Sequence, residues 1–301
     1  MKIIFLRKAI QKERFLLGLQ TDRQEKGHFV NPHIRIGNQT AISCADPLEP
    51  FLFAVQNGFD AFEWFVDKKE QADGSVAGWD ETDIDADTRI WIHDHGVAHD
   101  VLFTVHAPWQ ANPLEADGVS LLIRSLDFAR DIGAELVNLH LYMESGSQGF
   151  VQALEPVLRY AAAAKLRISI ENTPQTTPDD FNQLFACLAE LSTIPAGIVG
   201  MCLDIGHANL CPPTRNNFIH YLDLLDEAVP IIHIHAHENC GDRDSHLTLF
   251  TGPSREDDAG IRALVERLHR RAYQGAVILE QWPNPPQLLV EAAKRLRNLL
   301  G

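Results

Sequence analysis

Short apolar runs alternate with amphipathic stretches from about residue 34 to the end of the chain. The apolar runs predict strands over residues 36–42, 61–65, 101–105, 136–141, 167–170, 198–203, 231–234 and 276–279. Between them, apolar residues recur every three or four positions, which predicts helices over residues 117–132, 149–164, 178–191, 215–228, 256–272 and 286–300. Strands that alternate with helices pair in parallel. Eight of them predict a single closed (β/α)8 barrel.

Residues 1–34 do not follow this alternation. They carry runs of charge, a turn signal at Gly27-His28 and the pair Asn31-Pro32. We therefore predict an N-terminal extension over residues 1–34 and one barrel domain over residues 35–301. After the second strand, residues 72–79 predict a loop that overhangs the mouth of the barrel.

Composition narrows the classes of protein. Hydrophobic residues make up 45% and charged residues 22% of the 301 residues, as in ordinary globular proteins. The five cysteines never occur as CxxC, which argues against a disulfide framework or a thiolate zinc site. The apolar runs are too short to span a membrane, and the mixed start of the chain predicts a cytoplasmic protein. The net charge of −15 makes nucleic acid a less favoured partner.

Polar side chains follow six consecutive predicted strands. In (β/α)8 barrels the chemistry lies at the C-terminal ends of the strands. Any one of these side chains alone has a structural explanation, such as a core hydrogen bond, a turn cap or an ion pair. Their gathering at one end of the barrel favours a metal site, because buried carboxylates and imidazoles need a partner. The residues are His106, His140, Glu171, Asp204, His235 and Glu280, with His207, Asp244 and His246 in the following loops.

The seventh strand leads into a row of alternating histidines. If His235 points into the barrel, His233 shares its direction one layer deeper, where we expect a core residue. His237 follows at the end of the strand and could reach a substrate or a metal ligand. We expect Asp242 to be a solvated loop charge.

Other polar and aromatic positions have weaker signals. Glu63 and Trp64 end the second strand and are expected either to contact a substrate or to belong to the barrel wall. His93, His95 and His99 lie on or after a helix and are predicted to be surface residues. Trp109, Tyr142 and Trp282 closely follow predicted ligands and could form an apolar wall for a substrate.

From about residue 36 onward the chain resembles the xylose isomerase-like TIM barrels. These include sugar and sugar-phosphate isomerases and epimerases, and the endonuclease IV type of abasic-site endonuclease. The motifs that carry the resemblance are His106-Ala107-Pro108, Glu171-Asn172-Thr173, Asp204-Ile205-Gly206-His207, His235-Ala236-His237-Glu238-Asn239, Asp244-Ser245-His246 and Glu280.

The resemblance implies two alternative metal centres. In the isomerases and epimerases, residues like Glu171, Asp204, His235 and Glu280 hold one divalent metal, often manganese. The two glutamates then exchange a proton at the carbon beside the substrate carbonyl, and His207 binds a substrate hydroxyl. In endonuclease IV, equivalents of His106, His140, His207, Asp244 and His246 complete a cluster of three zinc ions.

Three departures count against the endonuclease pattern. The fourth strand ends in His140-Leu141-Tyr142 where the endonucleases have His-Pro-Gly. The residues from Leu247 to Gly252 lack the usual Gly-x-Gly, and Glu238 stands where aspartate is usual, which leaves its role open.

The first hypothesis is therefore a metal-dependent isomerase or epimerase of a small sugar or sugar phosphate, with Glu171 and Glu280 as the catalytic pair. The second is an endonuclease IV-like zinc phosphoesterase, and the third is a catalytically inactive metal- or sugar-binding barrel. Under these hypotheses the cofactor is one to three divalent ions, manganese or zinc, with magnesium also compatible. The sequence leaves homo-oligomerisation open.

Overall fold

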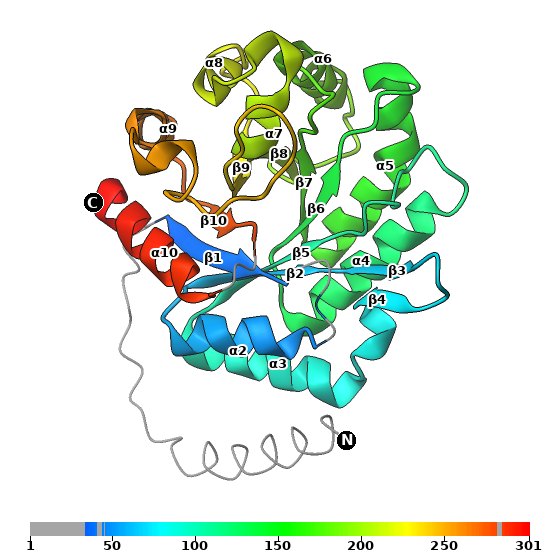
Figure 1. Ribbon diagram of the computed structural model, residues 1–301. Coiled ribbons are helices and arrows are strands. Elements are labelled where there is room, and N and C mark those ends of the chain that lie inside the picture. The colour runs from blue at the N-terminus through cyan, green and yellow to red at the C-terminus, as the bar shows by residue number, and fades with distance from the viewer. Residues whose placement is uncertain (1–33, 41–43, 45, 282–284) are drawn as a thin grey trace, which may run out of the picture. The chain divides into compact units, whose positions relative to one another are not determined.

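The computed structural model describes residues 34–40, 44, 46–281 and 285–301, and those from Ile34 to Gly301 form one compact unit. Eight parallel strands close into a barrel in the order β1-β10-β9-β8-β7-β6-β5-β2 (Figure 1). The strands are β1 (Arg35–Gln39), β2 (Ala61–Phe65), β5 (Leu102–His106), β6 (Leu136–His140), β7 (Arg167–Glu171), β8 (Val199–Asp204), β9 (Ile231–Ala236) and β10 (Ala276–Leu279). The predicted (β/α)8 barrel is confirmed.

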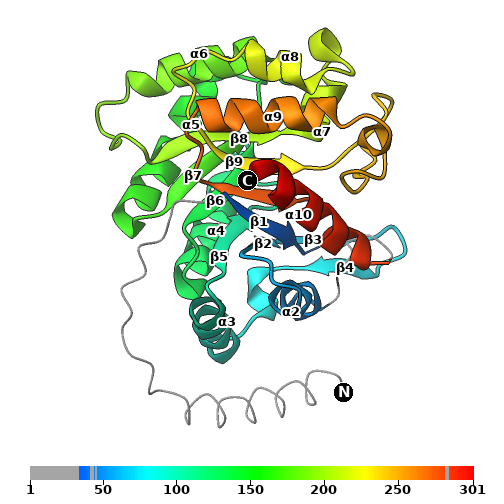
Figure 2. The ribbon, with the colours of Figure 1, turned by 90° about the vertical axis from the view of Figure 1, so that its left-hand side faces the viewer.

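Helices surround the strands, as Figures 1 and 2 show from two directions. They bury one apolar face each: α9 buries Ile261, Leu264, Val265 and Leu268, at the spacing of a helix lying on a sheet. The helices are α2 (Leu48–Gln56), α3 (Ala86–His99), α4 (Gly118–Ile132), α5 (Gly146–Ala164), α6 (Pro178–Ala189), α7 (Ile205–Leu210), α8 (Phe218–Asp223), α9 (Ala259–Arg270) and α10 (Gln287–Leu300). The short 3-10 helices in the described part of the chain are η1 (Glu81–Asp83), η2 (Pro212–Thr214) and η3 (Pro253–Arg255).

Two predicted elements are wrong in detail. The helix expected over residues 215–228 is only α8, because Asn217 caps its first turn through the His220 N–H and the helix ends at Asp223. The loop expected over residues 72–79 contains half of an antiparallel hairpin, β3 (Asp67–Glu70) with β4 (Val76–Trp79). Gly74, with φ of +78°, lies in the turn between them.

An aromatic cluster fills the space between β2, β5 and the neighbouring helices. The Trp64 ring centroid lies 5.3 Å from that of Phe51, 4.9 Å from Phe62 and 5.9 Å from Phe103. Trp64 therefore belongs to the barrel wall. His95 packs beside this cluster and is 5% exposed, which corrects its prediction as a surface residue, whereas His93 and His99 are exposed.

Among the described helices, none combines the length and apolar character that crossing a bilayer requires. The predicted extension over residues 1–34 lies outside the described residues, apart from Ile34, so the domain boundary stays a prediction.

Candidate metal centre

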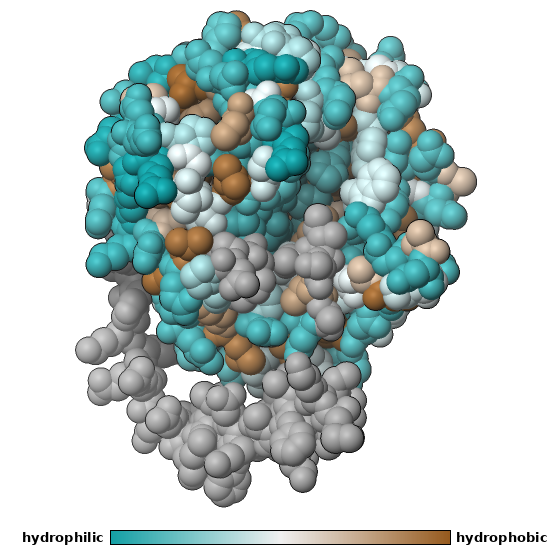
Figure 3. Space-filling view, viewed as in Figure 1, coloured by the Kyte–Doolittle hydropathy of each residue, from teal (hydrophilic) through white to brown (hydrophobic). Residues whose placement is uncertain are grey.

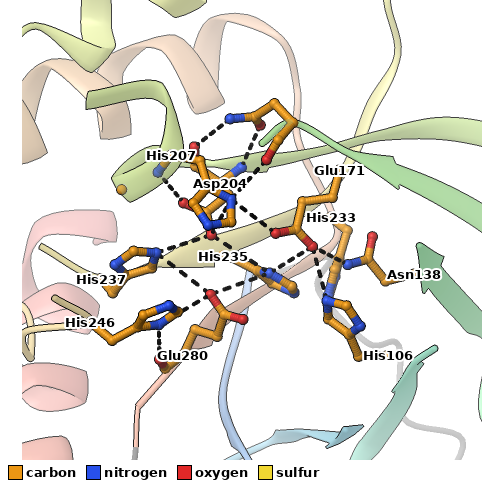
Figure 4. A network of polar contacts seen from close by, with 12 residues as sticks. His106, Asn138, Glu171, Asp204, His207, His233, His235, His237, His246 and Glu280 are labelled. Atoms are coloured by element: carbon orange, nitrogen blue, oxygen red, sulfur yellow. Dashed lines mark hydrogen bonds and ion pairs between the residues drawn. The ribbon is translucent and has the colours of Figure 1, made fainter. Parts of the chain in front are cut away.

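Four neighbouring strands bring their last polar side chains to one point inside the barrel mouth. Glu171 ends β7, Asp204 ends β8, His235 lies in β9 and Glu280 follows β10. His235 Nδ1 lies 3.2 Å from Glu171 Oε2, 3.9 Å from Asp204 Oδ2 and 3.7 Å from Glu280 Oε2 (Figure 4). All four residues are buried. We call them the central set.

Local structure fixes the direction of the Asp204 carboxylate. Its Oδ1 accepts the His207 N–H at 2.7 Å and so caps the first turn of α7. Its Oδ2 is thereby left for the site. The Asn172 amide also clamps the Asp204 backbone, accepting its N–H and donating to its carbonyl, each at 2.9 Å. One cap and one clamp thus orient both Asp204 and His207.

The five other predicted residues extend the central set in two directions. His106 Nε2 lies 3.1 Å from Glu171 Oε2, and His140 Nε2 lies 3.5 Å from Glu171 Oε1. On the other side, His207 Nε2 and His246 Nε2 lie 3.1 and 3.0 Å from the same oxygen, Asp244 Oδ2. The structure thus brings all nine sequence-predicted residues into one continuous cluster.

Backbone carbonyls determine the tautomers of three of these imidazoles. His106 Nδ1 lies 2.7 Å from Ala107 O, His207 Nδ1 lies 2.8 Å from Asn172 O, and His246 Nδ1 lies 2.9 Å from Glu280 O. A carbonyl only accepts hydrogen bonds, so each Nδ1 carries a proton. In the neutral imidazole the lone pair is then on Nε2, which lies 3.0–3.1 Å from a carboxylate oxygen in each of the three residues and is available to a metal.

Several buried atoms in this cluster suit a cation. Among the residues that the structure describes, Glu171 Oε1, His235 Nδ1, His237 Nδ1 and Glu280 Oε2 are buried and make no hydrogen bond of suitable geometry. Leaving such groups unpaired costs about 1–3 kcal/mol each. Carboxylate oxygens and imidazole nitrogens are donors that zinc and manganese accept. The residues present therefore fit a divalent metal.

The carboxylates of the cluster differ in their electrostatic surroundings. Burial favours the neutral acid at Glu171, but His235 and His140 outweigh it and hold the pKa of Glu171 well below its usual range. At Glu280 burial prevails and raises the pKa. Asp244 is less buried, and His207 and His246 lower its pKa.

The imidazoles respond in the opposite sense. Burial disfavours their charge, yet Glu280 and Asp244 raise the pKa of His246 to about 10. Asp204 likewise raises the pKa of His207 well above its usual range. The buried carboxylates thus favour protonated, positively charged imidazoles beside them. A bound divalent cation would supply the same compensating positive charge.

Glu63 and His233 contact each other beside the central set, and Glu63 contacts His235 of that set. Glu63 Oε2 lies 2.8 Å from His233 Nε2 and accepts the Thr104 hydroxyl at 2.8 Å, while Glu63 Oε1 lies 2.8 Å from His235 Nε2. His233 is a core residue, as predicted from its position. Glu63 points into the barrel toward both histidines. Successive side chains of a strand point to opposite faces, so the alternation along β2 distinguishes the inward Glu63 from the outward Trp64.

Asn138 was not among the predicted site residues, yet it also contacts the central set. It precedes His140 by two positions in β6, so strand alternation places both on the inner face. Its amide donates to Glu171 Oε2 and accepts the Ser169 hydroxyl at 2.6 Å. Asn138 therefore helps to orient the Glu171 carboxylate.

Glu238 shapes the loop that carries Asp244 and His246. Its backbone pairs with Leu247 in both directions, at 2.8 and 2.9 Å. Its carboxylate accepts the N–H groups of Gly252 and Ser254 at 3.1 and 2.8 Å. The role that the sequence left open is thus loop formation. Asp242 is exposed, as predicted.

A cavity of about 690 Å³ opens above the cluster. Trp109 and Tyr142 line it, and the Tyr142 hydroxyl donates to the Trp109 carbonyl. Lys69 Nζ lies 5.3 Å from the centroid of the Trp109 ring and 2.7 Å from Asp67 Oδ2. Trp282 lies outside the described residues.

The model of one protein family, the xylose isomerase-like TIM barrel, matches residues 51–299. The chain belongs to this family. The match spans most of the barrel, including every predicted ligand.

Solved structures in the same fold include two kinds of enzyme. A D-tagatose 3-epimerase-like protein superposes with a TM-score of 0.68 at 19% identity, covering 89% of this chain and 97% of that chain. Endonuclease IV from Thermus thermophilus gives a TM-score of 0.59 at 19% identity, covering 88% of this chain and 98% of that chain. At this identity the likeness shows the fold alone.

Curated relatives match the xylose isomerase-like chain over part of their length. An uncharacterized protein of Sinorhizobium fredii is 28% identical over 162 residues, which cover 50% of this chain and 48% of that protein. The chain spans about half to two thirds of the length of the curated relatives it matches.

Proposed function

We propose that this protein is a divalent-metal-dependent isomerase or epimerase of a small sugar or sugar phosphate. The observation that carries the proposal is the pair of buried glutamates in the central set. Glu171 and Glu280 each bring a carboxylate oxygen within 3.7 Å of His235 Nδ1, and Glu280 also lines the cavity. They come from strands on different sides of β8 and β9, so they approach His235 from two directions.

The central set of Glu171, Asp204, His235 and Glu280 would hold the metal, manganese or zinc. When bound there, the metal polarises the oxygens of the substrate and so acidifies the adjacent C–H bond. One glutamate removes the proton from the carbon beside the carbonyl, and the other returns a proton to complete the isomerisation. Their burial keeps bulk water away from this transfer.

The cavity suits a compact polyol better than a polyanion. Among the described residues that line it, Lys69 is the only lysine or arginine, and its charge is paired with Asp67. Glu144, Asp244 and Glu280 add negative charge. The face in Figure 3 is mainly hydrophilic, with hydrophobic residues in small separate groups. Trp109 and Tyr142 offer apolar surface for the C–H face of a sugar ring.

Solvent exchange tests the proposed reaction. The manganese- or zinc-loaded protein is incubated in deuterium oxide with D-tagatose, D-psicose, D-fructose and ketose phosphates, and deuterium incorporation is followed by NMR. We expect exchange at the carbon beside the carbonyl of at least one ketose. Glu171→Gln and Glu280→Gln should each lower the rate by at least about 100-fold, since general acid–base groups contribute about 10²–10⁴-fold.

The matched control is His269→Ala, which removes an exposed imidazole from α9, away from the site. It should exchange at the wild-type rate. The proposal is wrong if the metal-loaded wild type exchanges no ketose, or if both glutamine variants retain full activity.

One observation favours a second candidate, an endonuclease IV-like phosphoesterase. His106 and His140 lie within 3.5 Å of Glu171, and His207 and His246 lie within 3.1 Å of Asp244, so donors for more than one metal ion are close together. Zinc-dependent nicking of DNA with an abasic site would support it, especially if His106→Ala abolished the cleavage. Metal binding with neither exchange nor nicking would leave an inactive binding barrel.

A further inference from the structure

His237 is an additional imidazole in the middle of the cluster. It lies outside the nine predicted ligands, and its side chain is fully buried. In Figure 4 it lies beside His246, on the side of Asp204 and Glu280 away from His106. Its Nε2 is 3.1 Å from Asp204 Oδ2, and its Nδ1 is 3.8 Å from Asp244 Oδ1.

We propose that His237 is the fourth protein ligand of an outer metal centre formed with His207, Asp244 and His246. The inference rests on the proposed function in one respect, namely that this cluster binds divalent metal. It goes beyond that function because it adds a ligand and gives the outer ion a role of its own.

The hydrogen bonds of His237 leave the right nitrogen free. Its Nε2 is within hydrogen-bond distance of Asp204 Oδ2 at 3.1 Å, and a carboxylate there accepts, so Nε2 carries the proton. The lone pair is then on Nδ1, which is buried and makes no hydrogen bond with any described residue. That nitrogen is the one nearer to Asp244.

The other three ligands already point to the same place. The Nε2 atoms of His207 and His246 both lie within 3.1 Å of Asp244 Oδ2. One ligand atom from each of the four residues lies within 4.8 Å of every other. Zinc binds imidazole at about 2.0–2.1 Å in a tetrahedron, so four donors this close can converge on one ion with small movements.

The backbone makes room for this ring. A Cβ added at Gly206 would lie 2.0 Å from His237 Cε1 and 2.4 Å from its Nδ1. Gly206 is not among the glycines with positive φ, so its backbone does not require glycine. The space that Gly206 leaves is occupied by His237. The ring also stacks on His246, with centroids 4.0 Å apart and planes 12° apart.

Four protein ligands define what the outer ion does. Zinc sites with four protein ligands are closed and structural, whereas catalytic sites keep one position for water or substrate. Asp244 and His246 belong to the loop between β9 and α9, whereas His237 directly follows the last residue of β9 and His207 lies in α7. The outer ion therefore fastens this loop beside the mouth and leaves the chemistry to the central set.

Metal titration tests the inference without an activity assay. Metal-free protein is titrated with Zn²⁺ against a chromophoric chelator, and with Co²⁺ by visible absorption, which reports tetrahedral coordination. His237→Gln keeps an amide N–H for Asp204 but offers no nitrogen lone pair in place of Nδ1. We expect the variant to bind one zinc equivalent about 100-fold more weakly and to lose the matching cobalt absorption band. Loss of a residue that only hydrogen-bonds to a metal ligand already lowers metal affinity by up to about 100-fold.

A second variant perturbs the same site without changing any of its ligands. Gly206→Ala retains the imidazole but displaces it, and should weaken the same equivalent. His269→Ala should match the wild type. Circular dichroism checks that each variant folds.

The outcomes separate the two proposals. If His237→Gln and Gly206→Ala bind every equivalent with wild-type affinity and an unchanged cobalt spectrum, the inference is overturned and the proposed function stands. If one equivalent is lost but the wild type exchanges no ketose, the inference is supported and the isomerase proposal fails. If the wild type binds no divalent ion, both fail.

Discussion

Replacing Glu63 with glutamine should destabilise the barrel although the two side chains have the same shape. Glu63 is fully buried, and its two oxygens face Thr104 Oγ1, His233 Nε2 and His235 Nε2, each at 2.8 Å. The carboxylate accepts hydrogen bonds from the Thr104 hydroxyl and His233 Nε2 through Oε2, and its Oε1 forms an ion-pair contact with His235. A glutamine has one acceptor oxygen and no charge, so it cannot keep both the hydrogen bonds to Oε2 and the ion-pair contact with His235.

The size of the effect follows from the hydrogen bonds that the substitution breaks. Hydrogen bonds to a charged group contribute about 1.5–3 kcal/mol, and a buried donor left unpaired costs about 1–3 kcal/mol. We therefore expect Glu63→Gln to lower the free energy of unfolding by about 3 kcal/mol. At about 2 °C per kcal/mol for a chain of this size, Tm should fall by about 6 °C.

Urea unfolding of the metal-free protein, followed by circular dichroism at neutral pH, measures this difference. Thr104→Val is the matched control, because it removes only one of the three donors and should cost about 1 kcal/mol. The reasoning is refuted if Glu63→Gln unfolds at the wild-type midpoint, since the two hydrogen bonds and the ion-pair contact of Glu63 would then contribute nothing to stability.

Three further outcomes are expected. Removing metal with a chelator should lower Tm by about 5 °C, and adding back manganese or zinc at about 100 times Kd should restore it, because such binding contributes about 2.7 kcal/mol; an unchanged Tm would contradict the metal site. Trp109→Ala should raise KM for the exchanged ketose by about tenfold with kcat within about twofold, since Trp109 lines the cavity without touching the central set. Arg267 holds the pKa of Asp223 below its usual value, so their ion pair stabilises the fold above about pH 4 and this contribution is lost as pH falls through the folded pKa. Arg267→Ala should therefore cost about 0.5 kcal/mol in urea unfolding at pH 7 and less at pH 3, whereas an equal cost at both would argue against the pair.

The strand ends show why most of the site could be predicted. A (β/α)8 barrel turns the order of residues along the chain into a ring in space, so polar residues that end successive strands must meet. Glu171, Asp204, His235 and Glu280 are such residues, and the structure brings them within 3.9 Å of one imidazole nitrogen. No knowledge of helix packing was needed for that placement.

What escaped prediction depends on facts that periodicity does not contain. Burial of His95 depends on how α3 rotates against Phe51, a tertiary contact. The β3–β4 hairpin forms from a polar stretch whose hydrophobic pattern is that of a loop. The free nitrogen of His237 depends on its hydrogen bond to Asp204, which only the three-dimensional arrangement shows.

The carbonyl groups that fix the tautomers of His106, His207 and His246 belong to the backbone. No side-chain substitution can delete these carbonyl groups, so any sequence that keeps the backbone fold also keeps the orientation of each ligand nitrogen. Selection or design can then vary the residues between the ligands, and so change the preferred metal and substrate, while the coordinating nitrogens keep their orientation. A barrel built in this way can change its chemistry without first rebuilding its metal centre.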